Sequence, residues 1–263
     1  MKRVKIHYTI LGVLILPLLW QTSLAQGPPI STDTPIFLGL EGRGLRTFIK
    51  YTSKENATAY AAPMVLPYNL RTDLLVGVVA PFLRISPEGM ASKAGIGDVS
   101  VFAKYLLLQN DKLRQTFRIA VKLQETFPVG NNNSLPALGL GAYQTTVGLV
   151  GAYITTSVGL YSDIGYTAIS KGIPDKITYN IAFGYPLLPV TYPPKQVNIY
   201  LELNGNSIPD TGQHSIFISP GIQVIPSKKF LIETGVQVPI QEDLPESQKT
   251  NVVVTLGTRI LIF

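Results

Sequence analysis

The sequence predicts an all-β protein: an antiparallel transmembrane β-barrel of about twelve strands, an even number as in single-chain bacterial barrels, after a cleaved N-terminal signal peptide. Three observations predict this class. Segments that alternate apolar and polar residues recur along the chain, many of them exceed the roughly 5–6 residues of a soluble strand, and the connections between them alternate in length. Strands of roughly 9–11 residues with an apolar outer row and a hydrated inner row are what a membrane barrel needs.

The hairpin at residues 95–127 shows this pattern most clearly. Two long arms meet at a short polar turn. Because successive strand side chains face opposite sides, Phe117 and Val121 lie on one face of the second arm, whereas Arg118 and Lys122 lie on the other. One face is therefore apolar and the other is polar and charged.

Residues 1–25 have the features of a secretory signal peptide. A basic start precedes an apolar run at residues 10–19, and the small residues Ser23 and Ala25 follow it. The apolar run is shorter than the ~20 residues that a spanning helix needs, which favours cleavage over an uncleaved anchor. Residues 26–44, rich in proline and glycine, are then expected to form an irregular periplasmic lead-in, and residues 45–263 to form the barrel.

Each strand is assigned where an alternating run lies between turn signals. The expected strands are residues 45–52, 60–68, 73–84, 95–108, 114–127, 143–149, 158–169, 176–185, 197–204, 215–224, 230–240 and 251–263. Pro63 and Pro67 weaken the second strand, because proline cannot donate to a ladder. Short connections after residues 68, 108 and 225 and longer ones after residues 84, 127, 204 and 240 indicate periplasmic turns and extracellular loops.

Composition excludes several classes of protein. Charged residues make up 14% of the 263 residues and hydrophobic residues 46%, which is a low charge density for a water-exposed surface. Removal of Lys2, Arg3 and Lys5 with the signal leaves 19 of the 22 bases against 16 acids, so the net charge falls from +6 to +3. No basic footprint for nucleic acid results, and the absence of cysteine excludes disulfides and thiolate metal sites.

Charged and tyrosine side chains on the inner rows are the candidate site residues. The expected lumen-facing set is Arg46, Lys50, Asp73, Asp98, Lys104, Arg118, Lys122, Tyr161, Asp163, Tyr200, Glu202, Glu233 and Arg259. Opposite charges in a confined lumen must be paired or solvated, so the set forms either a structural ion-pair network or the lining of a hydrated path.

Catalytic, metal and cofactor sites find little support in the sequence. His214 is the one histidine after the signal, beside Ser215, and nothing indicates a third group that would orient it. No paired histidines and no run of alternating acids suggest metal ligands. We therefore expect no catalytic residues, no metal ligands and no cofactor.

Two glycine-rich stretches carry a resemblance to a known family. The residues are Gly95, Gly97, Asp98, Lys104 and Tyr105, followed by Gly139, Gly141 and Tyr143. Their G-x-G-D…K-Y pattern resembles the outer-membrane barrel family named for the meta-pathway of phenol degradation. The resemblance implies a β-barrel that transports aromatic or other apolar compounds, and it covers the middle third of the chain best.

The sequence as a whole leads to one functional expectation and three rivals. We expect a monomer in the outer membrane of a Gram-negative-type bacterium, with the lipid bilayer and a small, apolar or aromatic solute as its partners. The first rival is a structural or surface barrel whose lumen is plugged. The others are a barrel enzyme that acts on lipid through His214 and Ser215, and a soluble secreted β-sandwich.

Overall fold

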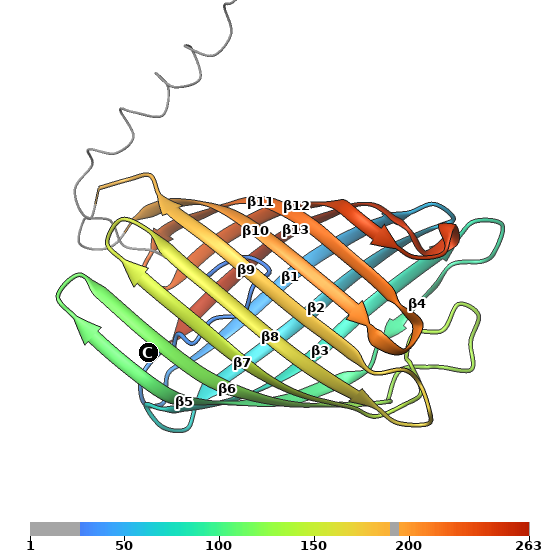
Figure 1. Cartoon of the computed structure of the whole chain (residues 1–263), viewed down its shortest axis with the longest axis horizontal. Helices are drawn as coiled ribbons and strands as arrows, with labels where there is room; N and C mark the ends of the chain where they lie inside the picture. Colours follow the sequence, from blue (N-terminus) through green and yellow to red (C-terminus); the bar gives the residue numbers. More distant parts are fainter. Residues whose placement is uncertain (1–26, 190–194, 263) are drawn as a thin grey trace, which may run out of the picture.

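The computed structural model describes residues 27–189 and 195–262, and its strands form one closed antiparallel sheet (Figure 1). The strands are β1 (Arg43–Lys54), β2 (Ala57–Asn69), β3 (Leu74–Pro87), β4 (Lys93–Ile96), β5 (Val99–Lys112), β6 (Gln115–Phe127), β7 (Gln144–Thr155), β8 (Gly159–Ile169), β9 (Lys176–Pro186), β10 (Gln196–Ile208), β11 (Gln213–Ser227), β12 (Phe230–Asp243) and β13 (Thr250–Ile262). Two single-turn 3₁₀ helices, η2 (Pro209–Thr211) and η3 (Glu246–Gln248), lie between strands. The predicted signal peptide lies outside the described residues.

The thirteen strands make twelve positions around the barrel. Each strand pairs antiparallel with its chain neighbour from β5 to β13, and the β1–β13 and β2–β3 pairings close the ring. The short β4 pairs with the second half of β3, while β5 pairs with the first half, so β4 and β5 together fill one position. The predicted closed antiparallel barrel of twelve strands is confirmed.

Alternation along each strand separates the two surfaces of the wall. In β8, Leu160 and Ile164 are 47% and 54% exposed, whereas Tyr161 between them is 2% exposed. The same contrast holds in β10 between exposed Leu201 and buried Glu202. Apolar side chains thus cover the outside and polar ones line the inside, which is the reverse of a water-soluble domain.

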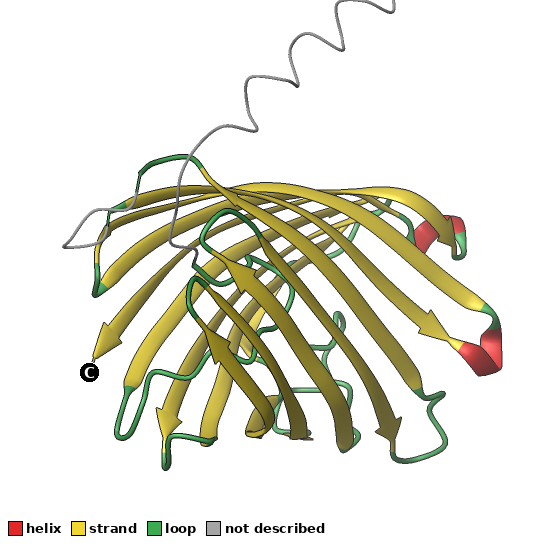
Figure 2. Ribbon diagram, turned by 60° about the vertical axis from the view of Figure 1, so that its left-hand side comes forward, coloured by secondary structure: helices red, strands yellow, loops and turns green. Residues whose placement is uncertain are grey.

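The two ends of the barrel differ in their connections (Figure 2). The end that holds the start of β1 and the end of β13 also has the two-residue turns at 113–114 and 228–229. The opposite end has the 16-residue loop 128–143 and the six-residue connections 170–175 and 244–249. Most connections follow the predicted asymmetry between short turns and long loops. Two depart from it: the 187–195 connection at the short-turn end is nine residues long, and the 55–56 turn at the opposite end has only two residues.

The prolines of β2 weaken the ladder locally without ending the strand. Pro63 and Pro67 are both paired with β3, at Pro81 and Gly77. The ladder between β2 and β1 skips both prolines, because neither can donate a backbone hydrogen bond to it. The strand therefore continues through them on one edge only.

The N-terminal part of the described chain lies inside the barrel. Residues 27–38, which we call the lumen segment, run as irregular backbone along the inner face and are drawn in blue within the ring of strands (Figure 1). Their hydrogen bonds reach wall residues 130 or more positions away in sequence, such as Glu202 and Asp163. This placement differs from the periplasmic lead-in that the sequence predicts over residues 26–44.

No helix in the described ranges combines the length and apolar character required to cross a membrane.

Candidate functional site

Glu202 of β10 holds the backbone of the lumen segment. Its carboxylate accepts hydrogen bonds from the backbone N–H groups of Ile30 (2.9 Å), Ser31 (3.1 Å) and Thr32 (2.6 Å), and from the Thr32 hydroxyl (2.7 Å). The carboxylate is 1% exposed. A buried carboxylate is stable only when its lone pairs are satisfied, and here the segment supplies every one of these donors.

Other inner side chains donate to the carbonyl groups of the same segment. Tyr161 and Tyr200 donate to Gly27 (3.0 and 2.6 Å), Gln223 to Pro28 (2.9 Å), Arg259 to Pro29 (2.5 Å) and Arg46 to Ile30. An irregular backbone buried in a barrel must have its polar groups bound, because it has no ladder of its own. These five side chains therefore supply the hydrogen-bond donors that the carbonyl groups of the segment would otherwise lack.

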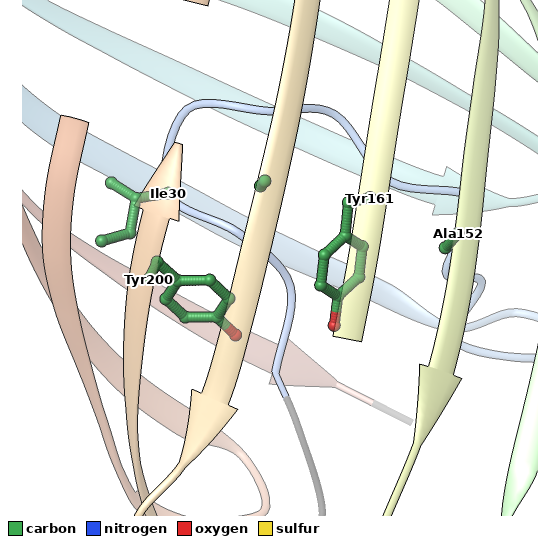
Figure 3. Packing of buried hydrophobic residues seen from close by; sticks show 5 residues of the cluster. Ile30, Ala152, Tyr161 and Tyr200 are labelled. Carbon is green, nitrogen blue, oxygen red and sulfur yellow. The ribbon is translucent and has the colours of Figure 1, made fainter. Parts of the chain in front are cut away.

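An apolar contact anchors the segment among the polar ones. Ile30 packs in a cluster with Tyr161, Tyr200, Ala152 and Ala182 on the inner wall, four members of which are labelled in Figure 3. Space for Ile30 comes from a glycine of β11, since a Cβ at Gly221 would collide with the end of the Ile30 side chain. The wall is thus shaped to this residue.

Two arginines and one glutamate form a buried ion cluster beneath the segment. Glu233 accepts from Arg46 and Arg259, each at 2.8 Å, and its side chain is fully buried. Both arginines also bind carbonyl oxygens of the segment. The cluster thus holds one negative charge between two positive charges, which leaves a net charge of +1.

A second cluster places two lysines around one aspartate of the lumen segment. Lys104 of β5 and Lys122 of β6 both form ion pairs with Asp33, the latter at 3.2 Å. The Asp33 backbone N–H donates to Asp163 at 2.8 Å. Burial alone would raise the pKa of Asp33, but the two ammonium charges outweigh it and hold this pKa well below its usual range.

A cavity of about 500 Å³ lies between the lumen segment and the wall. Its polar side carries the two arginines of the first ion cluster and the charged groups of the second, and its apolar side includes Ile36, Leu38, Val65, Leu75, Val79, Phe102 and Leu231. Lys104 and Lys122 lie 6.0 and 5.7 Å from the centre of the Phe102 ring, so the aromatic face borders the cationic corner. The cavity is of the size and mixed lining typical of small-molecule sites.

The remaining predicted site residues lie in different places. Lys50 is on the inner row of β1 and forms no ion pair with any residue in the described ranges. Arg118 pairs with Asp111 at 3.1 Å near the β5–β6 turn. Asp73 pairs with Arg71 at 2.9 Å in the turn before β3, at the end of the barrel rather than in its middle.

Asp98 binds a loop rather than the lumen segment. Its carboxylate accepts from the backbone N–H groups of Gly130 (3.0 Å) and Leu140 (2.8 Å), which ties the 128–143 loop to the break between β4 and β5. A Cβ at Gly139 would collide with this carboxylate and would lie 2.8 Å from the Gly130 oxygen. The close approach of this loop to Asp98 therefore explains Gly139, whereas a Cβ at Gly97 would meet Leu83 and one at Gly141 would meet Asn132.

The histidine and serine of the enzyme hypothesis point apart. His214 and Ser215 are consecutive residues of β11, so their side chains lie on opposite faces of the wall. His214 contacts the Tyr179 hydroxyl, and Ser215 is buried. Within the described part of the chain, no group of three or more His, Cys, Asp or Glu residues is placed to hold a metal ion.

Residues 46–245 match the family model described as "Putative MetA-pathway of phenol degradation". The chain belongs to this family. The resemblance noted from the glycine motifs is thereby confirmed. Among proteins with curated descriptions, none matches the chain.

Solved structures share the barrel fold of this family member. The COG4313 outer membrane channel from Pseudomonas putida F1 is similar with a TM-score of 0.68 and 12% identity, over 89% of this chain and 100% of that one. The KdgM porin, solved in complex with disordered oligogalacturonate, is similar with a TM-score of 0.52 and 9% identity, over 84% and 99% of the two chains. At these identities the likeness concerns the fold, which is that of a porin-like barrel.

The sequence pattern predicted neither the lumen segment nor its partners Gln223 and Gln237. Gln237 donates to Ser31 at 3.3 Å, and neither glutamine was among the candidate residues. One feature of the sequence could have indicated the segment. The strands β10, β11 and β12 carry many inward hydrogen-bonding side chains, more than a lumen filled with water alone requires.

Proposed function

We propose that this family member is a monomeric outer-membrane channel of a Gram-negative-type bacterium, made with a cleaved signal peptide. A small solute, apolar or aromatic, passes through its mixed-charge lumen. The apolar outer rows of the strands fit lipid, and the short-turn end that holds both barrel termini is the periplasmic end. Family membership and the porin-like fold support passage of a solute rather than a reaction.

The observation that carries the proposal is the cavity between the lumen segment and the wall. It combines an apolar wall with charged groups inside the barrel, where a plain structural core would be filled. The lumen segment borders this cavity and is irregular backbone, so its displacement would widen the path without breaking any strand ladder.

A second candidate function has a specific observation in its favour. The lumen segment makes hydrogen bonds along residues 27–34, and these contacts fill part of the lumen. A barrel closed in this way could serve as a structural or surface protein that transports nothing. The two candidates differ in whether the segment moves.

Flux through the purified, refolded protein separates the two. Proteoliposomes would be loaded with a fluorescent probe that reports entry of a neutral aromatic solute, with protein-free liposomes correcting for diffusion through lipid. A channel gives entry above this background, and entry that rises when residues 28–34 are replaced by a Gly/Ser stretch of equal length. No entry above background for the unaltered protein, with entry only after the replacement, would favour the closed structural barrel.

A further inference from the structure

We propose that the cavity beside the lumen segment binds a small organic carboxylate with an apolar body, and that Asp33 occupies the position of that carboxylate in the present structure. This inference rests on the proposed function, because it names the class of solute for the same lumen. The segment would then carry a built-in competitor of the solute.

Two lysines surround the carboxylate of Asp33. Lys104 and Lys122 come from neighbouring strands and are paired with each other across the ladder, so both ammonium groups approach one carboxylate from the same wall. A site that already holds one carboxylate between two cations offers the charge and the spacing that another carboxylate needs.

The inner wall carries an excess of positive charge. In the middle of the barrel, the described strands carry Arg46, Lys50, Lys104, Lys122 and Arg259 against Asp163, Glu202 and Glu233. The wall alone has two more bases than acids, and Asp33 of the segment offsets one of them. Displacement of Asp33 would leave two lysines facing the cavity, a position that favours an anion.

The surface next to the two lysines is apolar. Phe102, Leu75 and Val79 form an apolar wall beside the cationic corner, and Ile36 of the segment faces the same cavity. A neutral aromatic solute would bury its ring there but could not replace Asp33 as the partner of the two lysines. A free inorganic anion would match the lysines and leave the apolar wall empty, so an organic carboxylate fits both surfaces best.

A solute carboxylate can exchange with Asp33 between the two lysines. A solute carboxylate that replaces Asp33 keeps Lys104 and Lys122 paired, so no buried ammonium is left without a partner during the exchange. Asp33 lies on irregular backbone and can leave the lysines without disrupting a strand. Binding of the solute would thus loosen the segment that narrows its own path.

Binding of benzoate and of its neutral analogue benzamide to the refolded full-length mature protein tests the inference. We expect benzoate to bind more tightly than benzamide, and Asp33→Asn to raise benzoate affinity roughly tenfold with little change for benzamide, because a competing charge-assisted pair is removed. Lys122→Met should lower benzoate affinity by a similar factor. Matched controls are Asp210→Asn in η2 and Lys112→Met at the exposed end of β5, which should leave both affinities unchanged.

Several outcomes would overturn the inference. Equal affinities of the unaltered protein for benzoate and benzamide would contradict it. An unchanged benzoate affinity in Asp33→Asn would contradict it as well. If Asp33→Asn raised the affinity for both ligands, Asp33 would only hold the segment in place. The flux assay separates this failure from that of the proposed function: entry of neutral aromatics without a preference for benzoate rejects the carboxylate site alone, whereas benzoate binding without any entry rejects the channel alone.

Discussion

At the scale of single residues, the inner face is organised by carboxylates that bind backbone rather than by charge pairs alone. Glu202 binds three consecutive N–H groups of the lumen segment, and Asp98 binds two N–H groups of the 128–143 loop. Hydrogen bonds to charged groups are stronger than neutral ones, and leaving such a group buried without its partners is costly. Each carboxylate therefore positions a stretch of chain that has no ladder of its own.

Replacement of Glu202 by glutamine should release the segment. The amide keeps the shape but loses the charge, and its NH₂ group opposes the backbone donors that faced the second oxygen. Hydrogen exchange at residues 30–32 should accelerate roughly tenfold to a hundredfold, since each charge-assisted bond contributes about 1.5–3 kcal/mol. Glu55→Gln, in the exposed β1–β2 turn, is the matched control. Unchanged protection in Glu202→Gln would show that the carboxylate does not hold the segment.

Replacement of Gly139 by alanine should loosen the 128–143 loop. The new Cβ would collide with the Asp98 carboxylate and lie 2.8 Å from the Gly130 oxygen, so the loop must shift. We expect a loss of about 1–3 kcal/mol in the free energy of unfolding, as for overpacked sites, and faster proteolysis within the loop. At Gly151 the nearest atom to an added Cβ is Ser162 Oγ at 3.4 Å, so Gly151→Ala should be tolerated. Equal effects of the two substitutions would contradict the role given to Asp98.

At the scale of the elements, alternation within each strand determines which side meets which solvent. The sequence predicted this correctly, because a period of two can be read directly from runs such as that of β6. It could not predict where β4 ends and β5 begins, since the break follows from the contact of Asp98 with a loop more than 30 residues later. Nor did it show that the prolines of β2 interrupt only one of its two ladders, because the sequence does not say which neighbour each backbone group faces.

Arginine on the outer face of β6 should destabilise the barrel more than arginine on its inner face. Leu123 is 54% exposed on the outer row, whereas the adjacent Gln124 lines the cavity. In lipid vesicles, Leu123→Arg should lower the free energy of unfolding by roughly 2–4 kcal/mol, the cost of arginine near the bilayer midplane, while Gln124→Arg should cost much less. Urea titration of both variants measures this. Similar losses for the two would mean that the outer row does not face hydrocarbon.

At the scale of the whole molecule, the barrel is a closed wall with its own N-terminal segment inside. The sequence predicted the wall but not the segment, which has no periodicity and contacts wall residues up to 230 positions away, as between Pro29 and Arg259. The two alternatives considered for the inner charges were an ion-pair network and the lining of a hydrated path. Part of the network exists, and several of its members also hold the segment.

Removal of the segment from the lumen should open the path. A chain whose residues 28–34 are replaced by Gly/Ser loses the Ile30 contact, the Thr32 hydroxyl bond to Glu202 and the Asp33 ion pairs together. We expect its single-channel conductance in planar bilayers to exceed that of the unaltered protein several-fold. The same conductance in both proteins would show that the segment does not narrow the lumen.

The most direct test of a lumen segment that moves to let solute pass is to lock it in place. The chain has no cysteine, so Ser31→Cys with Gln237→Cys, at two side chains in contact here, can be joined by a short bifunctional thiol reagent without side reactions at other thiols. We predict that solute entry into proteoliposomes stops in the cross-linked protein and continues in each single-cysteine variant treated with the same reagent. Undiminished entry through the cross-linked barrel would contradict this mechanism.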